Sequence, residues 1–198
     1  MKLVIFDTDQ LVQSALPNKC FGRAITAVMP QIPQEVTLEK NEQTDEFRLK
    51  QIVQKHLLHQ LTDQERHEIQ SYCIDFMRQD MMLNPIQKQV NKANVKAVID
   101  SFDNADVQIV LVSRNWPAIT SLLMPSTHLN LGYMPFINAM DVNNVQALLP
   151  AAIQKAQEYY ECRFYAEVEL VSTNTLLVKT AKMMGWKINQ PTLTQAIA

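Results

Sequence analysis

The feature that most constrains the fold of this chain is a set of four short segments rich in apolar and β-branched residues. They lie at residues 2–6 (KLVIF), 107–112 (VQIVLV), 134–140 (MPFINAM) and 166–171 (AEVELV). The first two are apolar along nearly their whole length, which is the pattern of strands in a parallel sheet that is covered on both faces. The sequence therefore predicts a sheet that is buried between two layers.

Helical patterns alternate with these segments. They occupy residues 94–104, 117–124, 150–162 and 175–185, and the last ends on a glycine, which suits a helix C-terminus. Strands that alternate with helices are joined by right-handed crossovers. We therefore expect an α/β fold with a Rossmann-like, doubly wound parallel sheet.

Residues 14–90 interrupt this alternation. They contain no convincing strand, and in two stretches, residues 44–61 and 62–82, apolar side chains recur at spacings of three and four. Each stretch opens with a Thr-Asp pair, which is a suitable helix N-cap. We therefore expect an all-helical domain at 14–90, inserted into an α/β core domain formed by residues 1–13 and 91–198.

Charge and glycine content exclude several classes of ligand. The 198 residues carry a formal net charge of -2 and a pI near 6.1, which leaves no basic surface of the kind that binds nucleic acid. The chain has only three glycines, Gly22, Gly132 and Gly185, whereas the phosphate-binding loops of dinucleotide-binding and P-loop proteins need several close together. We expect neither kind of loop and no nucleic-acid partner.

The cysteines and the N-terminus indicate a cellular location. Cys20, Cys73 and Cys162 are widely spaced and form no CxxC pair, so neither a disulfide framework nor a zinc site is indicated. The N-terminal apolar stretch is too short for a signal peptide, and no apolar run approaches the ~18 residues of a membrane span. We therefore expect a cytoplasmic protein that does not bind a membrane.

Two aspartates, Asp7 and Asp9, end the first apolar segment. Ligands of open parallel sheets bind beyond the carboxyl ends of the strands, so these side chains are placed where a site is expected. Two nearby carboxylates can bind a divalent cation, or they can divide the roles of nucleophile and general acid or base. The alternative is that Asp-Thr-Asp only begins a turn, because aspartate is common in turns.

The second apolar segment also ends on polar residues, namely Ser113, Arg114 and Asn115. A hydroxyl at the end of a strand and the amides beside it can hold a phosphate oxygen, and Arg114 could supply the opposite charge. Ser113 could equally be a turn or N-cap residue before Pro117. In the first interpretation, both strand ends contribute to one phosphate-binding site.

The sequence VIFDTDQLVQS resembles the first motif of the haloacid dehalogenase superfamily, in which an apolar strand is followed by Asp-x-Asp-Gly-Thr-Leu. The strand that ends at Ser113 is similar to the second motif, and VELVSTNTLLVKTAKMMGWK is similar to the last strand, loop and helix of the family. The helical insertion resembles the cap of the subfamily that contains phosphoglycolate phosphatases, β-phosphoglucomutases and dehalogenases. The resemblance covers residues 2–188 in the right order.

This resemblance implies a mechanism. Asp7 would be the nucleophile that takes up a phosphoryl group, and Asp9 would be the general acid that protonates the leaving oxygen and later activates water. Ser113, with Arg114 and Asn115 beside it, would hold the phosphoryl group. Mg²⁺ would lie between the Asp7 carboxylate, the backbone carbonyl of Asp9, the phosphate and water.

Three departures distinguish the chain from the motifs of the family. Gln10 replaces Gly-Thr in the first motif, which shortens that loop by one residue. Ala147 stands at the position of the lysine of the third motif, and Lys155 lies two turns into the next helix, where we expect it to be solvated. Thr173 and Leu177 stand at the acidic positions of the fourth motif.

Few carboxylates therefore remain to bind the implied Mg²⁺. Asp7 could be the only one, together with neutral oxygens such as those of Thr173 or Asn174. Asp141, which follows the third strand segment, is a reserve ligand, although a loop or capping role accounts for it as well. A hard cation is held more weakly by fewer charged ligands, so the implied site would be a weak one.

Two functions from different classes follow from these observations. The first is a hydrolase of weak activity that removes phosphate from a small phosphorylated metabolite through an aspartyl-phosphate. The second is a catalytically inactive relative that serves as a binding or regulatory module, with a protein as a possible partner, and the missing lysine and carboxylates favour it. A metal-independent dehalogenase that uses the same nucleophile ranks below both, because Asp9 belongs to the phosphatase pattern.

Overall fold

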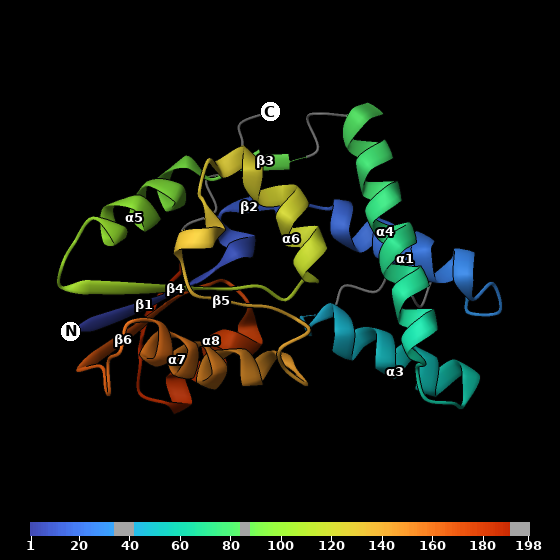
Figure 1. The fold of residues 1–198 in the computed structure, drawn as a ribbon. Coiled ribbons are helices and arrows are strands. Elements are labelled where there is room, and N and C mark those ends of the chain that lie inside the picture. The colour runs from blue at the N-terminus through green and yellow to red at the C-terminus, as the bar shows by residue number, and fades with distance from the viewer. Residues whose placement is uncertain (34–41, 84–87, 191–198) are drawn as a thin grey trace.

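The computed structural model describes residues 1–33, 42–83 and 88–190. At its centre lies a five-stranded sheet with the strand order β5-β4-β1-β6-β7, in which all neighbouring strands are parallel (Figure 1). The strands are β1 (Lys2–Asp7), β4 (Val107–Val112), β5 (Phe136–Ile137), β6 (Glu167–Val171) and β7 (Lys187–Asn189). The predicted α/β fold with a parallel sheet is confirmed.

Helices cover both faces of this sheet (Figure 1). One face carries α5 (Lys92–Phe102) and α6 (Pro117–Leu123), and the other carries α7 (Leu148–Tyr159) and α8 (Thr175–Met183). Short 3-10 helices lie in the connecting segments, namely η1 (Thr8–Gln10), η3 (Met124–Thr127), η4 (Leu131–Tyr133) and η5 (Val145–Ala147).

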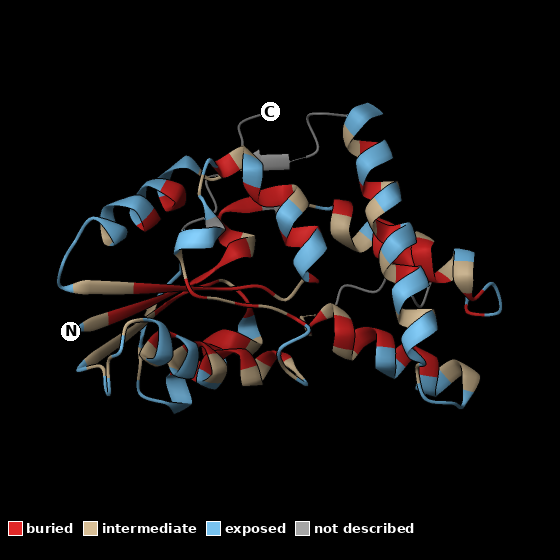
Figure 2. Ribbon diagram, viewed as in Figure 1, coloured by how far each residue is buried: buried red, intermediate tan, exposed pale blue. Residues whose placement is uncertain are grey.

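The central strand β1 explains why the first apolar segment has no polar residue in its middle. Val4 and Phe6 belong to the hydrophobic core on one face of the sheet, and Leu3 and Ile5 belong to the core on the other. All four side chains are buried (Figure 2). A strand in this position can place a charged side chain only at its end.

The three central strands end at the same level. Asp7 pairs with Val112 of β4, and Phe6 pairs with Val171 of β6. The residues that follow these strands therefore emerge together at one edge of the sheet, which is where ligands of parallel sheets bind.

A helical module stands at this edge (Figure 1). It consists of α1 (Leu16–Val28), α3 (Asp45–Leu57) and α4 (Asp63–Leu83), and α1 packs along α4. The two helices predicted from periodicity correspond to α3 and α4. Thr44 caps α3 as its position suggested, because its hydroxyl accepts a hydrogen bond from the Phe47 amide at 3.3 Å.

Two short antiparallel strands join this module to the core. They are β2 (Val12–Ser14) and β3 (Lys88–Val90), in which Val12 pairs with Val90. The sequence predicts no strand in residues 14–90, which is wrong for β3 and for the end of β2, because a three-residue strand is too short to show a pattern. We propose that the core and the helical domain divide at this ladder, at residues 13/14 and 90/91.

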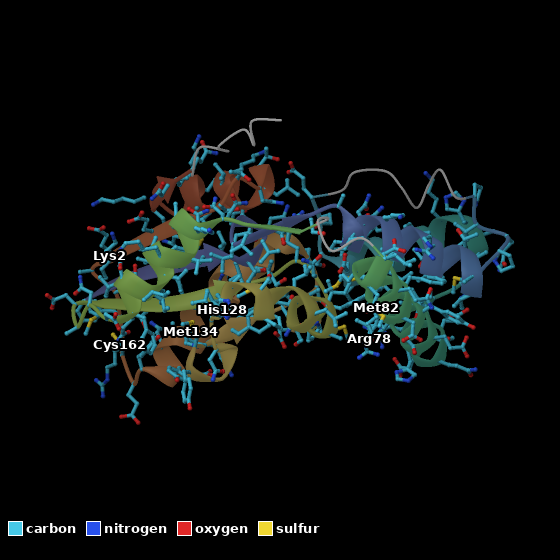
Figure 3. All side chains as sticks on the ribbon, turned by 90° about the horizontal axis from the view of Figure 1, so that it is seen from above. Lys2, Arg78, Met82, His128, Met134 and Cys162 are labelled. Atoms are coloured by element: carbon cyan, nitrogen blue, oxygen red, sulfur yellow. The ribbon has the colours of Figure 1, made fainter. Side chains whose placement is uncertain are left out.

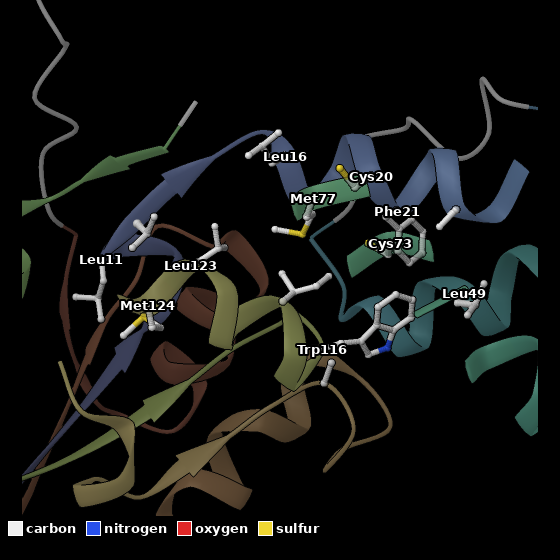
Figure 4. Close-up of a cluster of buried hydrophobic side chains, with 14 of the residues drawn as sticks. Leu11, Leu16, Cys20, Phe21, Leu49, Cys73, Met77, Trp116, Leu123 and Met124 are labelled. Atoms are coloured by element: carbon white, nitrogen blue, oxygen red, sulfur yellow. The ribbon is translucent and has the colours of Figure 1, made fainter. Parts of the chain in front are cut away.

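A continuous apolar core connects the helical module to the sheet (Figure 4). Trp116, in the loop between β4 and α6, is buried at its centre, with its ring centroid 5.4 Å from that of Phe21 in α1. The Trp116 indole nitrogen donates a hydrogen bond to the buried Glu46 carboxylate of α3 at 3.3 Å. One side chain of the core is therefore anchored among the helices of the module.

The end of the sheet that lies away from the helical module carries a separate charge cluster. Figure 3 shows Lys2 at that end and Arg78 and Met82 on the helical module. The Lys2 ammonium forms ion pairs with Glu167, at 3.3 Å, and with Glu169 of β6. These carboxylates are therefore engaged far from the edge at which β1 ends. Within the described residues, no helix is both long enough and apolar enough to span a membrane.

Candidate active site

A cavity of about 530 Å³ lies between the carboxyl edge of the sheet and the helical module. Core residues that line it include Asp7, Asp9, Arg114, Asn115, Thr173 and Asn174. The helices contribute Asn18, Asp45 and Arg48. Charged side chains from both parts of the chain therefore line one cavity.

Asp7 is the last residue of β1 and is completely buried. One carboxylate oxygen, Oδ1, accepts a hydrogen bond from the Asp9 amide at 3.1 Å, and the other, Oδ2, accepts one from the Ser172 hydroxyl at 2.7 Å. Burial and the nearby charge of Asp9 raise the pKa of Asp7 from 3.8 to about 6, against the opposing effects of Arg114 and these hydrogen bonds. A carboxyl group with this pKa is mostly ionised at neutral pH.

Asp9 lies in η1, two residues beyond the end of β1. The Asp7 carboxylate caps this short helix by accepting the hydrogen bond from the Asp9 amide. The Asp9 carboxylate accepts hydrogen bonds from the Arg114 guanidinium and, at 3.1 Å, from the side-chain amide of Asn115. The predicted phosphate-binding residues Arg114 and Asn115 thus meet Asp9. Both line the cavity.

Ser113 is brought to the same edge, but it is not among the residues that line the cavity. It is completely buried, lies 2.9 Å from the Thr120 hydroxyl of α6, and accepts a hydrogen bond from the Asn115 amide at 3.2 Å. In this arrangement the Ser113 hydroxyl holds the loop that carries Arg114. The sequence left open a turn role and a phosphate-binding role for Ser113. Only the phosphate-binding role requires this hydroxyl to contact a ligand.

The residues at the fourth motif, Ser172 to Asn174, are occupied by contacts within the protein. Ser172 bonds to Asp7, and the Thr173 hydroxyl accepts a hydrogen bond from the Gln10 side chain at 2.9 Å. Asn174 caps α8 by accepting a hydrogen bond from the Leu177 amide at 2.9 Å. Gln10, which replaces Gly-Thr in the shortened first motif, therefore fills the space beside the altered fourth motif.

Two further residues considered from the sequence lie outside the cavity lining. Asp141 is exposed, and its carboxylate accepts hydrogen bonds from the backbone amide of Asn138 at 2.8 Å and from its side chain at 2.7 Å. This arrangement corresponds to the loop role that had been considered for it. Lys155 is exposed on α7, as expected.

The helical module adds Asp45 and Arg48, which sequence reasoning did not assign to the site. The Asp45 carboxylate accepts a hydrogen bond from the Trp116 amide at 3.1 Å, and the Asp45 amide donates one to the Arg114 carbonyl at 2.9 Å. Burial, opposed by the Trp116 amide and nearby arginines, raises the pKa of Asp45 from 3.8 to about 7. Arg48 lies over the ring of Phe21, 4.5 Å from its centroid. The only sequence signal for either residue was its place in the first turn of a helix that follows a Thr N-cap.

The donor atoms at this edge do not fit the Mg²⁺ site that the resemblance implies. Mg²⁺ is bound by carboxylates and other oxygens in an octahedral arrangement. Here both oxygens of Asp7 accept hydrogen bonds from the protein, and the Asp9 carboxylate faces a guanidinium. Among the residues that the structure describes, no group of three or more His, Cys, Asp or Glu side chains could hold a metal ion.

Comparison with known proteins agrees with the fold. No family model and no curated protein sequence matches the chain. Among solved structures, it is similar to a hydrolase from Pseudomonas syringae, with a TM-score of 0.68 and 11% identity over 95% of this chain and 83% of that one. The shared architecture is a doubly wound α/β core with a helical cap.

Two further solved structures are also similar to this chain. A predicted phosphoglycolate phosphatase from Haemophilus somnus matches with a TM-score of 0.54 and 16% identity over 95% of this chain and 84% of that one. An archaeal β-phosphoglucomutase from Pyrococcus matches with a TM-score of 0.52 and 13% identity over 95% and 85% of the two chains. The chain therefore has the haloacid dehalogenase-like fold with a helical cap, as its motifs predicted. The helical module is called the cap below.

Proposed function

We propose that the protein is a hydrolase of small phosphorylated metabolites that uses Asp7 as its nucleophile and turns over slowly. The observation that carries this proposal is the convergence of Asp7, Asp9 and Arg114 on one cavity under the cap. Similar structures are described as a phosphoglycolate phosphatase and a β-phosphoglucomutase, both of which act on phosphorylated compounds. The cavity volume of about 530 Å³ suits a ligand of metabolite size.

The reaction would proceed in two displacements. An oxygen of the Asp7 carboxylate attacks phosphorus, the bond from phosphorus to the ester oxygen breaks, and Asp9 gives that oxygen a proton. Water then attacks the aspartyl-phosphate while Asp9 takes its proton, which releases inorganic phosphate and restores Asp7. Arg114 lies where it can offset the negative charge of the phosphoryl group as Asp7 approaches it.

Slow turnover is expected from the contacts of Asp9. Its carboxylate must release its hydrogen bonds with Arg114 and Asn115 and take up a proton from water before it can protonate the leaving oxygen. Ala147 also leaves the cavity without the lysine that the family places there. Each change weakens stabilisation of the transition state while leaving the nucleophile in place.

The experiment is a screen of phosphomonoesters for phosphate release by the wild type, Asp7→Asn and Asp9→Asn. Asp7→Asn should abolish release, and Asp9→Asn should reduce it by about a hundredfold or more, which is the usual contribution of a general acid. Asp141→Asn is the matched control, because it makes the same chemical change on an exposed loop. Release that persists in Asp7→Asn would contradict the proposed nucleophile.

One observation favours a second function, that of a binding module without catalysis. Each oxygen of the Asp7 and Asp9 carboxylates already accepts a hydrogen bond from the protein, which opposes their use as nucleophile and general acid. In that case ligands would raise the melting temperature of the protein and no phosphate would be released. The described cysteines are free thiols, which is consistent with a cytoplasmic location for either function.

A further inference from the structure

At the carboxyl edge of the sheet, positive charge is supplied by a side chain of the protein, that of Arg114. Arg114 follows β4 by two residues, and its guanidinium contacts the Asp9 carboxylate in an ion pair that is mostly shielded from solvent, each side chain being less than a quarter exposed. The charge of Arg114 also opposes the rise in the pKa of Asp7 and of Asp45. The Arg114 guanidinium therefore lies near three carboxylates, those of Asp7, Asp9 and Asp45, while Arg48 lines the cavity from the helical side. The Asp7 carboxylate is the one that the resemblance assigns to a metal.

Contacts from both sides of the cavity hold the backbone of Arg114 and its ion-pair partner Asp9. On the core side, Asn115 bonds to Asp9 and its amide bonds to the Ser113 hydroxyl. On the cap side, the Asp45 amide donates to the Arg114 carbonyl at 2.9 Å. Because its backbone and its partner Asp9 are both held, the Arg114 side chain is presented at the wall of the cavity.

Two features oppose a divalent cation at this position. The positions that would supply further carboxylates carry Thr173 and Leu177, and Thr173 is bonded to Gln10. A cation near Asp7 and Asp9 would also be repelled by the guanidinium, and such repulsion is strong where water is largely excluded. Dehydrating Mg²⁺ for so few ligands is unfavourable.

We infer that the Arg114 guanidinium takes the place of a divalent cation in this site, so that the cavity binds an oxyanion such as phosphate without Mg²⁺. A guanidinium offers several donors in a planar fork, which matches two oxygens of a phosphate or carboxylate group. The inference shares the ligand class of the proposed function, but it concerns binding and holds with or without turnover.

The test measures binding of inorganic phosphate and of Mg²⁺ separately, by calorimetry, on the wild type and on Arg114→Gln. Wild type should bind phosphate in the presence of a chelator, and added Mg²⁺ should not change the affinity. Arg114→Gln should bind phosphate about tenfold or more weakly, because a charge-assisted hydrogen bond is lost. The same variant should bind Mg²⁺ more tightly than wild type does, since Asp7 and Asp9 are left without their counter-charge.

Two variants control for folding and for general charge effects. Arg114→Lys keeps the positive charge, so it should still exclude Mg²⁺ even if phosphate binds more weakly to a point charge than to a fork. Arg78→Gln makes the matched change on an exposed cap position and should behave as wild type (Figure 3). Far-ultraviolet circular dichroism shows whether each variant is folded, and the wild-type titrations decide the inference even if Arg114→Gln is not.

The inference is overturned if wild type binds Mg²⁺ in a manner that Asp7→Asn abolishes, or if phosphate binds only when Mg²⁺ is present or does not bind at all. These outcomes are distinct from failure of the proposed function. Metal-independent phosphate binding without turnover supports the inference and refutes the hydrolase. Turnover that requires Mg²⁺ supports the hydrolase and refutes the inference.

Discussion

Replacing the proposed nucleophile should stabilise the protein, and the gain should depend on pH. Asp7 is completely buried, and its pKa is raised from 3.8 to about 6. An acid with a higher pKa in the folded state than in the unfolded state binds more protons when folded, so stability falls as pH rises between the two values. The charged carboxylate is therefore a cost of folding that is absent below about pH 4 and complete above about pH 6.

The magnitude follows from the size of the shift. One pKa unit corresponds to about 1.4 kcal/mol, so a shift of roughly two units destabilises the folded state by about 3 kcal/mol at neutral pH. Asparagine keeps the shape of the side chain and can still accept the hydrogen bond from the Asp9 amide. The Ser172 hydroxyl can rotate to accept from the new amide group, so Asp7→Asn should recover about 2–3 kcal/mol.

The assay is urea unfolding of wild type and Asp7→Asn at several values between about pH 4 and pH 8. The difference in unfolding free energy should be near zero at the acidic end and reach its full value above about pH 6. In thermal unfolding the gain corresponds to a rise of about 4–12 °C for a domain of this size. Equal differences at both ends of the range would refute the argument, because an effect without pH dependence cannot come from an ionised Asp7.

Three further predictions concern the cap and the core. Gly185→Ala should destabilise the protein by about 1 kcal/mol in urea unfolding, because Gly185 adopts φ +73 after α8 and an added Cβ meets no atom within 4 Å, which leaves only backbone strain. Trp116→Ala should lower the unfolding free energy by about 3–5 kcal/mol through the cavity it creates, and a smaller loss would mean that the cap collapses to fill the space. Trp116 fluorescence, recorded in a Trp186→Phe background, should titrate near pH 7 as Asp45 ionises, since the pKa of Asp45 is raised to about 7. Asp45→Asn should remove that transition, and its persistence would assign it to another group.

The sheet was predictable from sequence to the extent that its strands are buried on both faces. β1 and β4 are apolar runs, and their ends were placed within one residue. β7, by contrast, has three residues, Lys187–Asn189, of which two are exposed, so no pattern marks it. β2 and β3 are equally short, and their pairing joins residues that lie far apart in the chain.

The candidate site was predictable where it follows from strand ends. Asp7, Asp9 and Arg114 directly follow or end central strands, and the parallel register places them together. Asp45 and Arg48 belong to a helix whose position over the sheet depends on how the cap packs, and periodicity within that helix carries no information about it. The hydrogen bond between Gln10 and Thr173 could not be predicted either, because the two residues belong to different motifs that lie far apart in the chain.

The apolar core that passes through Trp116 limits how ligands reach the cavity. Moving the cap away from the sheet would expose the Trp116 ring to water, and burial of an aromatic side chain contributes about 4–6 kcal/mol. An open form at that free energy would be present in about one molecule in a thousand or fewer. Ligands too large for the mouth of the closed cavity would exchange at a rate limited by this opening, whereas small compounds would not depend on it.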